Sequence, residues 1–328
     1  MYWRLALIAL AAALVPATSF AQMTDGSKPF TVSVSPQYPR PFTSVTVTPT
    51  SNALSVTNAS MQLLVNGKQF YTGNATPVQV FIGALGSVTT IKAIVSSMGT
   101  KYETVFTIRP QDISLIVEPN SSVPPLYPGT AFLPIQGTAR LVAIADLRDT
   151  KNKPIPPSAI SYAWSIDDTR FDSASGIGKD TFVASVPAQY RSSTVSVTAQ
   201  SLDGKFVTST SADLEAVEPF VRMYETDPLL GVMFDRAIGA SFGMAGAQKT
   251  FFGAVFAHPT TAGEPQIKWF LNGTLAQTGP LVTLRPTGSG AGSASLSMQS
   301  SGGENLSAST QTTVTFGTSA AKLGIFGL

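Results

Sequence analysis

A cluster of carboxylates lies in the segment SIDDTRFDS, at Asp167, Asp168 and Asp172. A pair of carboxylates is the catalytic apparatus of most glycoside hydrolases, and three carboxylate oxygens would begin a calcium site. Two of the three residues, however, fall at the centre of a predicted hairpin turn, where aspartate is favoured because its side chain bonds nearby backbone amides. We therefore expect turn residues here, with Ca²⁺ binding as the alternative and catalysis as the lesser one.

Other catalytic residue types are scarce. His258 is the only histidine and there is no cysteine, so neither a typical zinc site nor a Cys–His pair can form. The one Gly-x-Ser-x-Gly motif, GASFG at 239–243, lacks the helix that a nucleophile elbow requires. We expect the motif to be a chance match, His258 to lie in a loop without a role, and the protein not to be an enzyme.

A hairpin pattern occurs three times along the chain. Its copies are MQLLVNGKQFYTG from Met61, ISYAWSIDDTRF from Ile160 and IKWFLNGTLAQTG from Ile267. The turns are about 100 residues apart, which is too long for a solenoid repeat and fits whole domains placed end to end. A later hairpin also recurs, and its Asp203-Gly204 pair in the second copy is typical of a type I′ turn.

A bulky residue stands three positions before each of the first turns. These residues are Leu63, Trp164 and Trp269. A large side chain at this position fills the space between two sheets in immunoglobulin domains, so we expect all three in the core. The alternative is that the tryptophans are exposed and stack on sugars.

Alternating apolar and polar residues, as in TSVTVTPT from Thr43, indicate strands with one buried face. About seven such strands fit into each domain-length stretch, as in an immunoglobulin-like sandwich. The predicted fold class is all-β, with three tandem immunoglobulin-like β-sandwich domains after an N-terminal signal peptide helix. The predicted boundaries are 1–21 for the signal peptide, 22–110, 111–219 and 220–317 for the three domains, and 318–328 for an apolar C-terminal tail.

The first residues, MYWRLALIALAAALVPATSFAQ, place Arg4 before an apolar run and then small residues, a pattern typical of a signal peptide cut after Ala21. An uncleaved anchor is the alternative, but the run is shorter than the roughly 20 residues that span a bilayer. With 12% charged residues, a net charge of +2 and no basic stripe, nucleic acid is not an expected partner. We expect a secreted, extracytoplasmic protein of the cell envelope or cell surface, with no membrane span after cleavage.

Three apolar segments have no evident place in a sandwich core. We expect VPPLYPGTAFLP, near the start of the second domain, and DPLLGVMFDRAIG, near the start of the third, to pack between successive domains, with exposed docking surfaces as the alternative. The tail carries Leu323, Ile325, Phe326 and Leu328. We expect these four residues to bind a protein partner in the cell envelope by strand pairing or by insertion into a groove.

The openings of the second and third domains, SLIVEPNSSVPPLYPGTAFLPIQGTARLVAIA and YETDPLLGVMFDRAIG, resemble uncharacterised exported bacterial proteins of the candidate-phylum type with tandem immunoglobulin-like or PKD-like domains. The resemblance implies architecture and compartment, and it carries no functional residue. The predicted function is that of a non-catalytic exported envelope or surface protein, an immunoglobulin-like rod acting as spacer, adhesin or component of a surface or pilus assembly through protein contacts. The alternative is a carbohydrate-binding accessory module that uses exposed aromatic residues, and a hydrolase is the third hypothesis.

Overall fold

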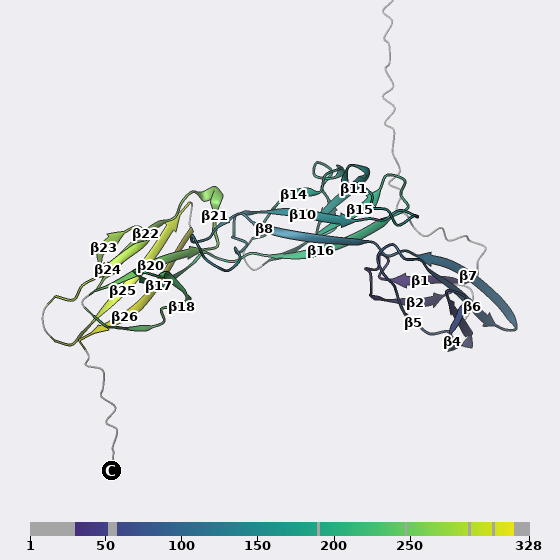
Figure 1. The fold of residues 1–328 in the computed structure, drawn as a ribbon, viewed down its shortest axis with the longest axis horizontal. Helices are drawn as coiled ribbons and strands as arrows, with labels where there is room; N and C mark the ends of the chain where they lie inside the picture. The colour runs from purple at the N-terminus through teal and green to yellow at the C-terminus, as the bar shows by residue number, and fades with distance from the viewer. Residues whose placement is uncertain are drawn as a thin grey trace, which may run out of the picture. The chain divides into compact units, whose positions relative to one another are not determined.

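The computed structural model describes residues 30–51, 58–188, 191–246, 248–287, 290–303 and 306–317. Almost all regular structure in these ranges is β-strand, so the all-β prediction is confirmed. No helix among them is long and apolar enough to cross a membrane. The predicted signal peptide and tail lie outside the described residues. The chain divides into two compact units, unit 1 at Met1–Arg109 and unit 2 at Pro110–Leu328 (Figure 1).

Unit 1 contains one β-sandwich, called sandwich 1. Its first sheet has the order β1 (Thr31–Ser35), β2 (Ser44–Thr50), β5 (Val78–Phe81). Its second sheet has the order β4 (Lys68–Asn74), β3 (Ser60–Val65), β6 (Thr89–Ser97), β7 (Thr100–Ile108). Val45 and Val47 from the first sheet meet Met61, Leu63 and Ile91 from the second, and all five are buried.

Unit 2 begins with a second sandwich, called sandwich 2. Its first sheet has the order β14 (Thr181–Ser185), β10 (Thr138–Asp146), β8 (Asp112–Pro119). Its second sheet comprises β12 (Thr169–Arg170), β11 (Ile160–Ile166), β15 (Ser192–Ser201) and β16 (Val207–Glu215), with β13 (Gly176–Ile177) also paired to β11. Leu141, Trp164 and Val197 lie in the core between the two sheets.

Unit 2 continues with sandwich 3. Its first sheet has the order β18 (Gly231–Ala237), β17 (Phe220–Asp227), β20 (Lys249–Phe256), β24 (Leu281–Leu284). Its second sheet has the order β19 (Ser241–Met244), β26 (Leu306–Phe316), β25 (Gly292–Gly302), β22 (Gln266–Leu271), β23 (Thr274–Thr278). The strands β19 and β26 pair in parallel, and the other pairs are antiparallel.

The three sandwiches share one topology once the additional strands are set aside, which are β13, β18, β19 and the short strands β9 (Ser121–Ser122) and β21 (His258–Pro259). In each, the first, second and fifth strands form one sheet, and the fourth, third, sixth and seventh strands form the other. This is the two-sheet, seven-strand arrangement of an immunoglobulin-like domain. The prediction of tandem sandwiches is therefore confirmed, while the exact domain boundaries stay a prediction.

The bulky residues before the turns occupy equivalent core positions. Leu63, Trp164 and Trp269 are fully buried, which confirms the core interpretation. Both indole N–H groups are satisfied by backbone carbonyls, at 2.9 Å from Nε1 of Trp164 to O of Lys179 and at 2.9 Å from Nε1 of Trp269 to O of Gly279. A buried indole needs such a partner, so these tryptophans are built into the cores.

The turns after these residues have the geometry that their sequences predict. Asn66, Asp167 and Asn272 have φ of 51°, 47° and 49°, and the residue after each also has positive φ, as a type I′ turn requires. The predicted type I′ turn at Asp203-Gly204 is wrong, because of that pair only Gly204 has positive φ. The amide of Gly204 instead bonds the carbonyl of Ser201 at 2.9 Å, inside a longer loop.

Candidate functional site

The clustered carboxylates of sandwich 2 are tied to local structure. Oδ1 of Asp167 accepts the amide of Thr194 at 2.8 Å, and Oδ1 of Asp172 lies 2.8 Å from Nε of Arg170. Asp168 is the second residue of the turn, with φ of 62°. The described part of the chain holds no group of three acidic, His or Cys side chains placed to ligate a metal. Calcium binding at this segment stays a prediction.

The residues of a hypothetical serine hydrolase are not brought together. Ser241 starts the strand β19 and is not followed by a helix. His258 is buried in the short strand β21 (His258–Pro259), with Nε2 3.1 Å from O of Gly263, so the expectation of a loop histidine is wrong. Ser241 pairs with Thr313 in β26, whereas His258 packs beside Gly302 at the other end of the β25–β26 pair. Most of the length of β26 therefore separates Ser241 from His258.

The largest feature that the predicted core does not explain is an aromatic cluster where sandwiches 2 and 3 meet, called here the aromatic junction. Sandwich 2 contributes Tyr127 and Phe132 from the segment between β8 and β10, and sandwich 3 contributes Phe220, Phe234 and Phe256. The ring of Tyr127 lies 5.5 Å from Phe234 and 5.0 Å from Phe256, edge to face in both cases. The ring of Phe132 lies 5.2 Å from Phe220. The junction is therefore a further hydrophobic core of unit 2.

The sequence of β20 explains why the outer face of the first sheet of sandwich 3 is apolar. Phe251 and Val255 point into the core of sandwich 3, whereas Phe252, Ala254 and Phe256 point to the opposite face and join the aromatic junction. A strand buried on both faces has a continuous apolar run in place of alternation. The run FFGAVFA is the sequence signal for the junction, and alternation alone misses it.

Backbone hydrogen bonds join the two sandwiches as well. The short strand β9 (Ser121–Ser122) pairs with β21, so that Ser122 faces His258. In the linker, the amide of Val217 donates to O of Leu133 at 2.8 Å, and the amide of Ile135 donates to O of Val217 at 3.2 Å. These bonds leave the linker little freedom. The interface interpretation is confirmed for Tyr127 and Phe132 of VPPLYPGTAFLP. In the same segment Leu133 packs against the core of sandwich 2 and Leu126 is 95% exposed.

The segment DPLLGVMFDRAIG agrees in part with interface packing and in part with the alternative, an exposed surface. Phe234 joins the aromatic junction. Leu229 and Leu230, by contrast, are 94% and 75% exposed at the turn between β17 and β18. For these two residues the alternative, an exposed apolar surface, agrees with the structure.

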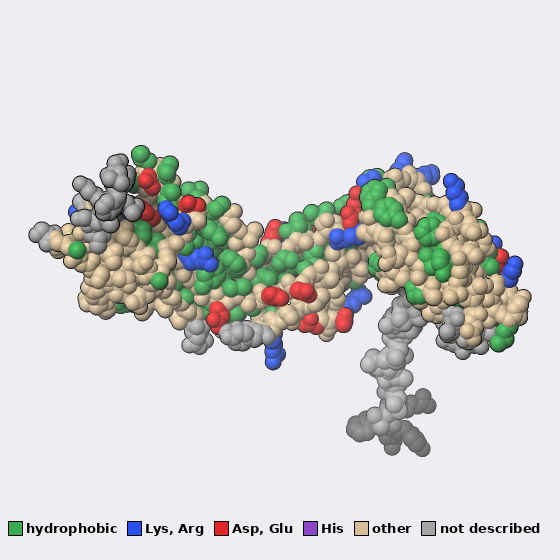
Figure 2. All heavy atoms as spheres, turned by 90° about the horizontal axis from the view of Figure 1, so that it is seen from below, with side chains coloured by type: hydrophobic (Ala, Val, Ile, Leu, Met, Phe, Trp, Pro, Cys, Tyr) green, Lys and Arg blue, Asp and Glu red, His purple; other side chains and the backbone are tan. Residues whose placement is uncertain are grey.

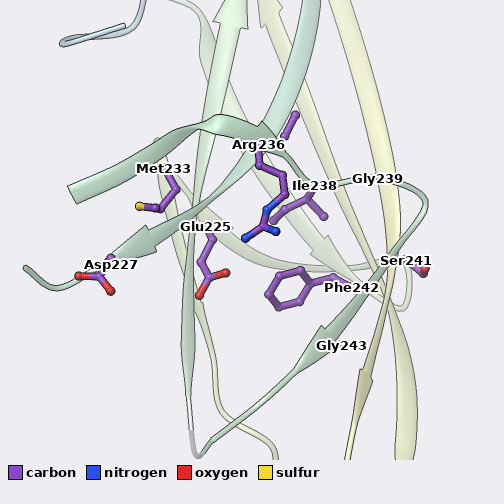
Figure 3. A pocket seen from close by; sticks show the side chains of 10 residues that line it. Glu225, Asp227, Met233, Arg236, Ile238, Gly239, Ser241, Phe242 and Gly243 are labelled. Carbon is purple, nitrogen blue, oxygen red and sulfur yellow. The ribbon is translucent and has the colours of Figure 1, made fainter. Parts of the chain in front are cut away.

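A cavity of about 510 Å³ opens beside this turn, between β17, β18 and β19 (Figure 3). Its apolar wall includes Ile238 and Phe242, which also pack against the core of sandwich 3. Glu225, Asp227 and Arg236 supply the charged rim, and Figure 3 shows the side chains of Glu225, Arg236 and Phe242 directed toward the same space.

The charges of this rim are compensated locally. Glu225 forms an ion pair with Lys249. Oδ1 of Asp227 accepts the amides of Leu229 at 2.7 Å and Leu230 at 2.9 Å. These hydrogen bonds hold the pKa of Asp227 below its ordinary value of 3.8, and the bond from Leu230 has a larger effect than the bond from Leu229. Asp227 therefore stabilises the turn.

Comparisons with known proteins give fold likenesses only. No protein-family model and no curated protein matches the chain. Similar solved structures include three N-terminal domains of the Hoc capsid protein of bacteriophage RB49 (12% identity, 88% of this chain and 98% of that chain, TM-score 0.26). Others are the fibronectin-III array of RIM-binding protein (10%, 86% and 95%, 0.32) and fibronectin(III)-like modules of Clostridium thermocellum CbhA (12%, 60% and 92%, 0.23). Each TM-score lies below 0.5, so none indicates how this chain is used.

Proposed function

We propose that the protein is a non-catalytic, exported component of the cell envelope or cell surface, which acts through protein–protein contacts as a spacer, adhesin or part of a surface or pilus assembly. The N-terminal sequence pattern supports export. The tandem sandwiches support a mechanical or adhesive use, since each folds around its own core without disulfides. The proposed bacterial origin rests on the resemblance described above.

The observation that carries the proposal is the aromatic junction. Five aromatic rings and a pair of short strands fix sandwich 3 against sandwich 2. An enzyme would concentrate its polar groups in a cleft, whereas the buried material here joins two domains. Rigid connection of successive domains is what a spacer needs, because a force or a binding event at one sandwich then reaches the next.

A capture experiment tests the proposal. The mature chain, residues 22–328, would be immobilised and incubated with envelope and cytoplasmic extracts of the source cells, beside a matched form that ends at residue 317. We expect specific envelope proteins on the mature chain, and loss of some of them from the shortened form if Leu323, Ile325, Phe326 and Leu328 bind a partner. Equal capture from both extracts, or none, would contradict the proposed function.

The alternative, carbohydrate binding through exposed aromatic residues, now rests on unit 1. Trp164 and Trp269 are buried and do not serve it. Phe42 and Phe81 are 66% and 61% exposed, and they are neighbours, because the amide of Phe42 bonds O of Gly83 at 3.0 Å beside the end of β5. Glycan binding that is measurable on an array and lost in Phe42→Ala would favour this alternative over the protein-contact proposal.

A further inference from the structure

The cavity beside β19 is an opening into the core of sandwich 3. Met233–Arg236 of β18 lie opposite Glu225 alone, so β18 departs from β17 over this stretch. Glu225 comes two residues after Met223, which points into the core, and therefore lies on the same side of β17. The departure of β18 leaves the end of the core open, with Ile238 and Phe242 as its apolar wall.

Two strand edges border this opening. In the part of the chain that the structure describes, β18 is the last strand of the first sheet of sandwich 3, and β19 is the last strand of the second. An edge strand presents a row of backbone N–H and C=O groups that can pair with a further strand. The opening therefore fits an extended segment that places apolar side chains on one face.

The C-terminal tail, residues 318–328, follows a strand that lies next to this opening. The strand β26 ends at Phe316, which pairs with Met244 at the end of β19. Ser241 and Phe242 of the same strand β19 line the cavity. A stretch of roughly 7–10 Å along β19 separates them from Met244. The tail thus begins one strand away from the cavity wall.

The tail has the length and the sequence pattern that the opening requires. Residues 318–322 precede Leu323 and can span up to about 17 Å. Passing over β19 to its free edge takes two strand spacings, about 10 Å, so the cavity lies within this reach. In an extended chain Leu323 and Ile325 share one face, whereas Phe326 and Leu328 share the other.

From these observations we propose that the tail of the same chain folds back along the free edge of β19 and places Leu323 and Ile325 in the cavity. The cavity volume of about 510 Å³ is in the range that holds small ligands, so it accommodates these two side chains. A tether this short gives an effective concentration in the millimolar range, which favours docking within one chain over docking in a second copy. The inference goes beyond the proposed function, because the contact lies inside a single chain.

The other apolar surface of unit 2 lies beyond the reach of the tail. Figure 2 shows hydrophobic side chains gathered on unit 2, and Ile144 and Val183 are exposed on sandwich 2. The strand β26 starts at Leu306, opposite Gly302 at the junction end, and its length of about 33 Å separates sandwich 2 from the base of the tail. The chain from Phe316 to Ile325 spans at most about 30 Å.

Disulfide trapping in the mature chain, residues 22–328, tests the inference, because the chain has no cysteine of its own. The trap form carries Ile325→Cys with Ser241→Cys, and the matched control form carries Ile325→Cys with Ser293→Cys. Ser241 and Ser293 are both exposed and lie one strand from β26, on opposite sides of it. Because a disulfide requires Cα atoms within about 7 Å, we expect the trap form to close a disulfide inside the monomer about tenfold faster than the control form.

Two further substitutions in the trap form test which face of the tail enters the cavity. Leu323→Ser removes an apolar side chain from the cavity, so trapping should slow about tenfold. Phe326→Ser is the matched control on the opposite face and should leave the rate within about twofold. Circular dichroism and the unfolding midpoint show whether each form is folded. If Ser241→Cys is not folded, Gly243→Cys on the same strand replaces it.

A disulfide-linked dimer of the trap form would assign the tail to a second copy and overturn the inference. Equal rates in the trap and control forms would overturn it too, as would equal slowing by Leu323→Ser and Phe326→Ser. None of these results changes the capture of envelope proteins by the mature chain, and an absence of capture leaves trapping unchanged. Failure of this inference and failure of the proposed function are therefore distinguishable.

Discussion

The residues Asn66, Asp167 and Asn272 each carry out two tasks in their turns. Their backbones adopt positive φ, which costs an ordinary L-residue about 1–2 kcal/mol. Their side chains fasten the turn to the neighbouring strand, because each Oδ1 accepts a backbone amide of the sixth strand of its sandwich. These amides belong to Thr90, Thr194 and Ser295, at 2.9, 2.8 and 2.9 Å. The two tasks together explain why only Asn and Asp occur at this position.

Asn272→Ala tests this account. The variant loses the bond to Ser295 and places alanine at positive φ, so we expect the free energy of unfolding of unit 2 to fall by about 2 kcal/mol. Guanidinium denaturation, followed by the fluorescence of the core tryptophans, measures the loss. Thr274→Ala, an exposed change just after the same turn, is the matched control and should stay within about 0.5 kcal/mol of wild type.

Asp167→Asn separates the turn role from the calcium alternative. Asparagine keeps the Oδ1 acceptor and tolerates positive φ, so we expect the free energy of unfolding of unit 2 to change by less than about 0.5 kcal/mol. We also expect no effect of calcium on the unfolding temperature of either form. A rise in the unfolding temperature with millimolar calcium that disappears in Asp167→Asn and in Asp172→Asn would establish a calcium site in place of a simple turn.

Asp227 predicts a pH dependence with a definite sign. The amides of Leu230 and Leu229 lower its pKa in the folded chain below 3.8, so its contribution to stability is fully present above pH 3.8 and is lost as the pH falls through the lower, folded pKa. Carbon-13 NMR titration of the carboxyl should give a pKa below 3.8. The stability difference between wild type and Asp227→Ala should shrink over the same acidic range. A pKa at or above 3.8 would show that the turn at Asp227–Gly231 is not held by these hydrogen bonds.

At the scale of the elements, the success of a sequence prediction depends on whether one or both faces of a strand are covered. In β2, Val45 and Val47 alternate with exposed or half-buried polar residues, and alternation correctly predicts a strand with one buried face. In β20, Phe256 is covered by residues that lie more than a hundred positions earlier, Tyr127 and Phe132. A local sequence pattern indicates that a strand is buried, but it does not indicate which residues cover it.

The same reasoning explains the mixed outcome for the segment that contains Leu229, Leu230 and Phe234. Its apolar composition indicated contact of some kind, which Phe234 makes in the aromatic junction. Composition does not indicate which way each side chain points, because the side-chain directions depend on the irregular pairing of β18 with β17 between Tyr224 and Thr226. His258 was misassigned for a related reason, because its partner strand β9 belongs to the other sandwich.

Phe132→Ala tests whether the aromatic junction stabilises unit 2. Removing this ring takes away its contacts with Phe220 and Phe256. Because the side chain is half-buried, we expect a loss at the low end of the range for phenylalanine truncation, about 2–3 kcal/mol in the unfolding of unit 2. Leu126→Ala, six residues earlier and 95% exposed, is the matched control with an expected change within about 0.5 kcal/mol. Equal effects of the two substitutions would contradict the junction's role.

At the scale of the whole molecule, cores and folding units do not correspond one to one. The chain has three sandwich cores, yet it forms two compact units, because sandwiches 2 and 3 share the aromatic junction and the β9–β21 pair. The sequence showed three repeats of a hairpin and thus three sandwiches. It did not show that two of them are coupled, since the coupling residues lie outside the repeated pattern.

This coupling predicts two thermal transitions for a chain with three cores. Sandwiches 2 and 3 should unfold together, because unfolding either one alone exposes the aromatic rings of the junction to water. Calorimetry of the mature chain should show one transition that is also seen in the isolated fragment 22–109, and a second, larger one that is also seen in the fragment 110–328. Phe132→Ala should divide the larger transition into two and leave the smaller one unchanged. Three transitions in the wild-type chain would mean that the junction contributes less free energy than the difference in stability between sandwiches 2 and 3. The rigid connection on which the proposed function relies would then be lost first on heating.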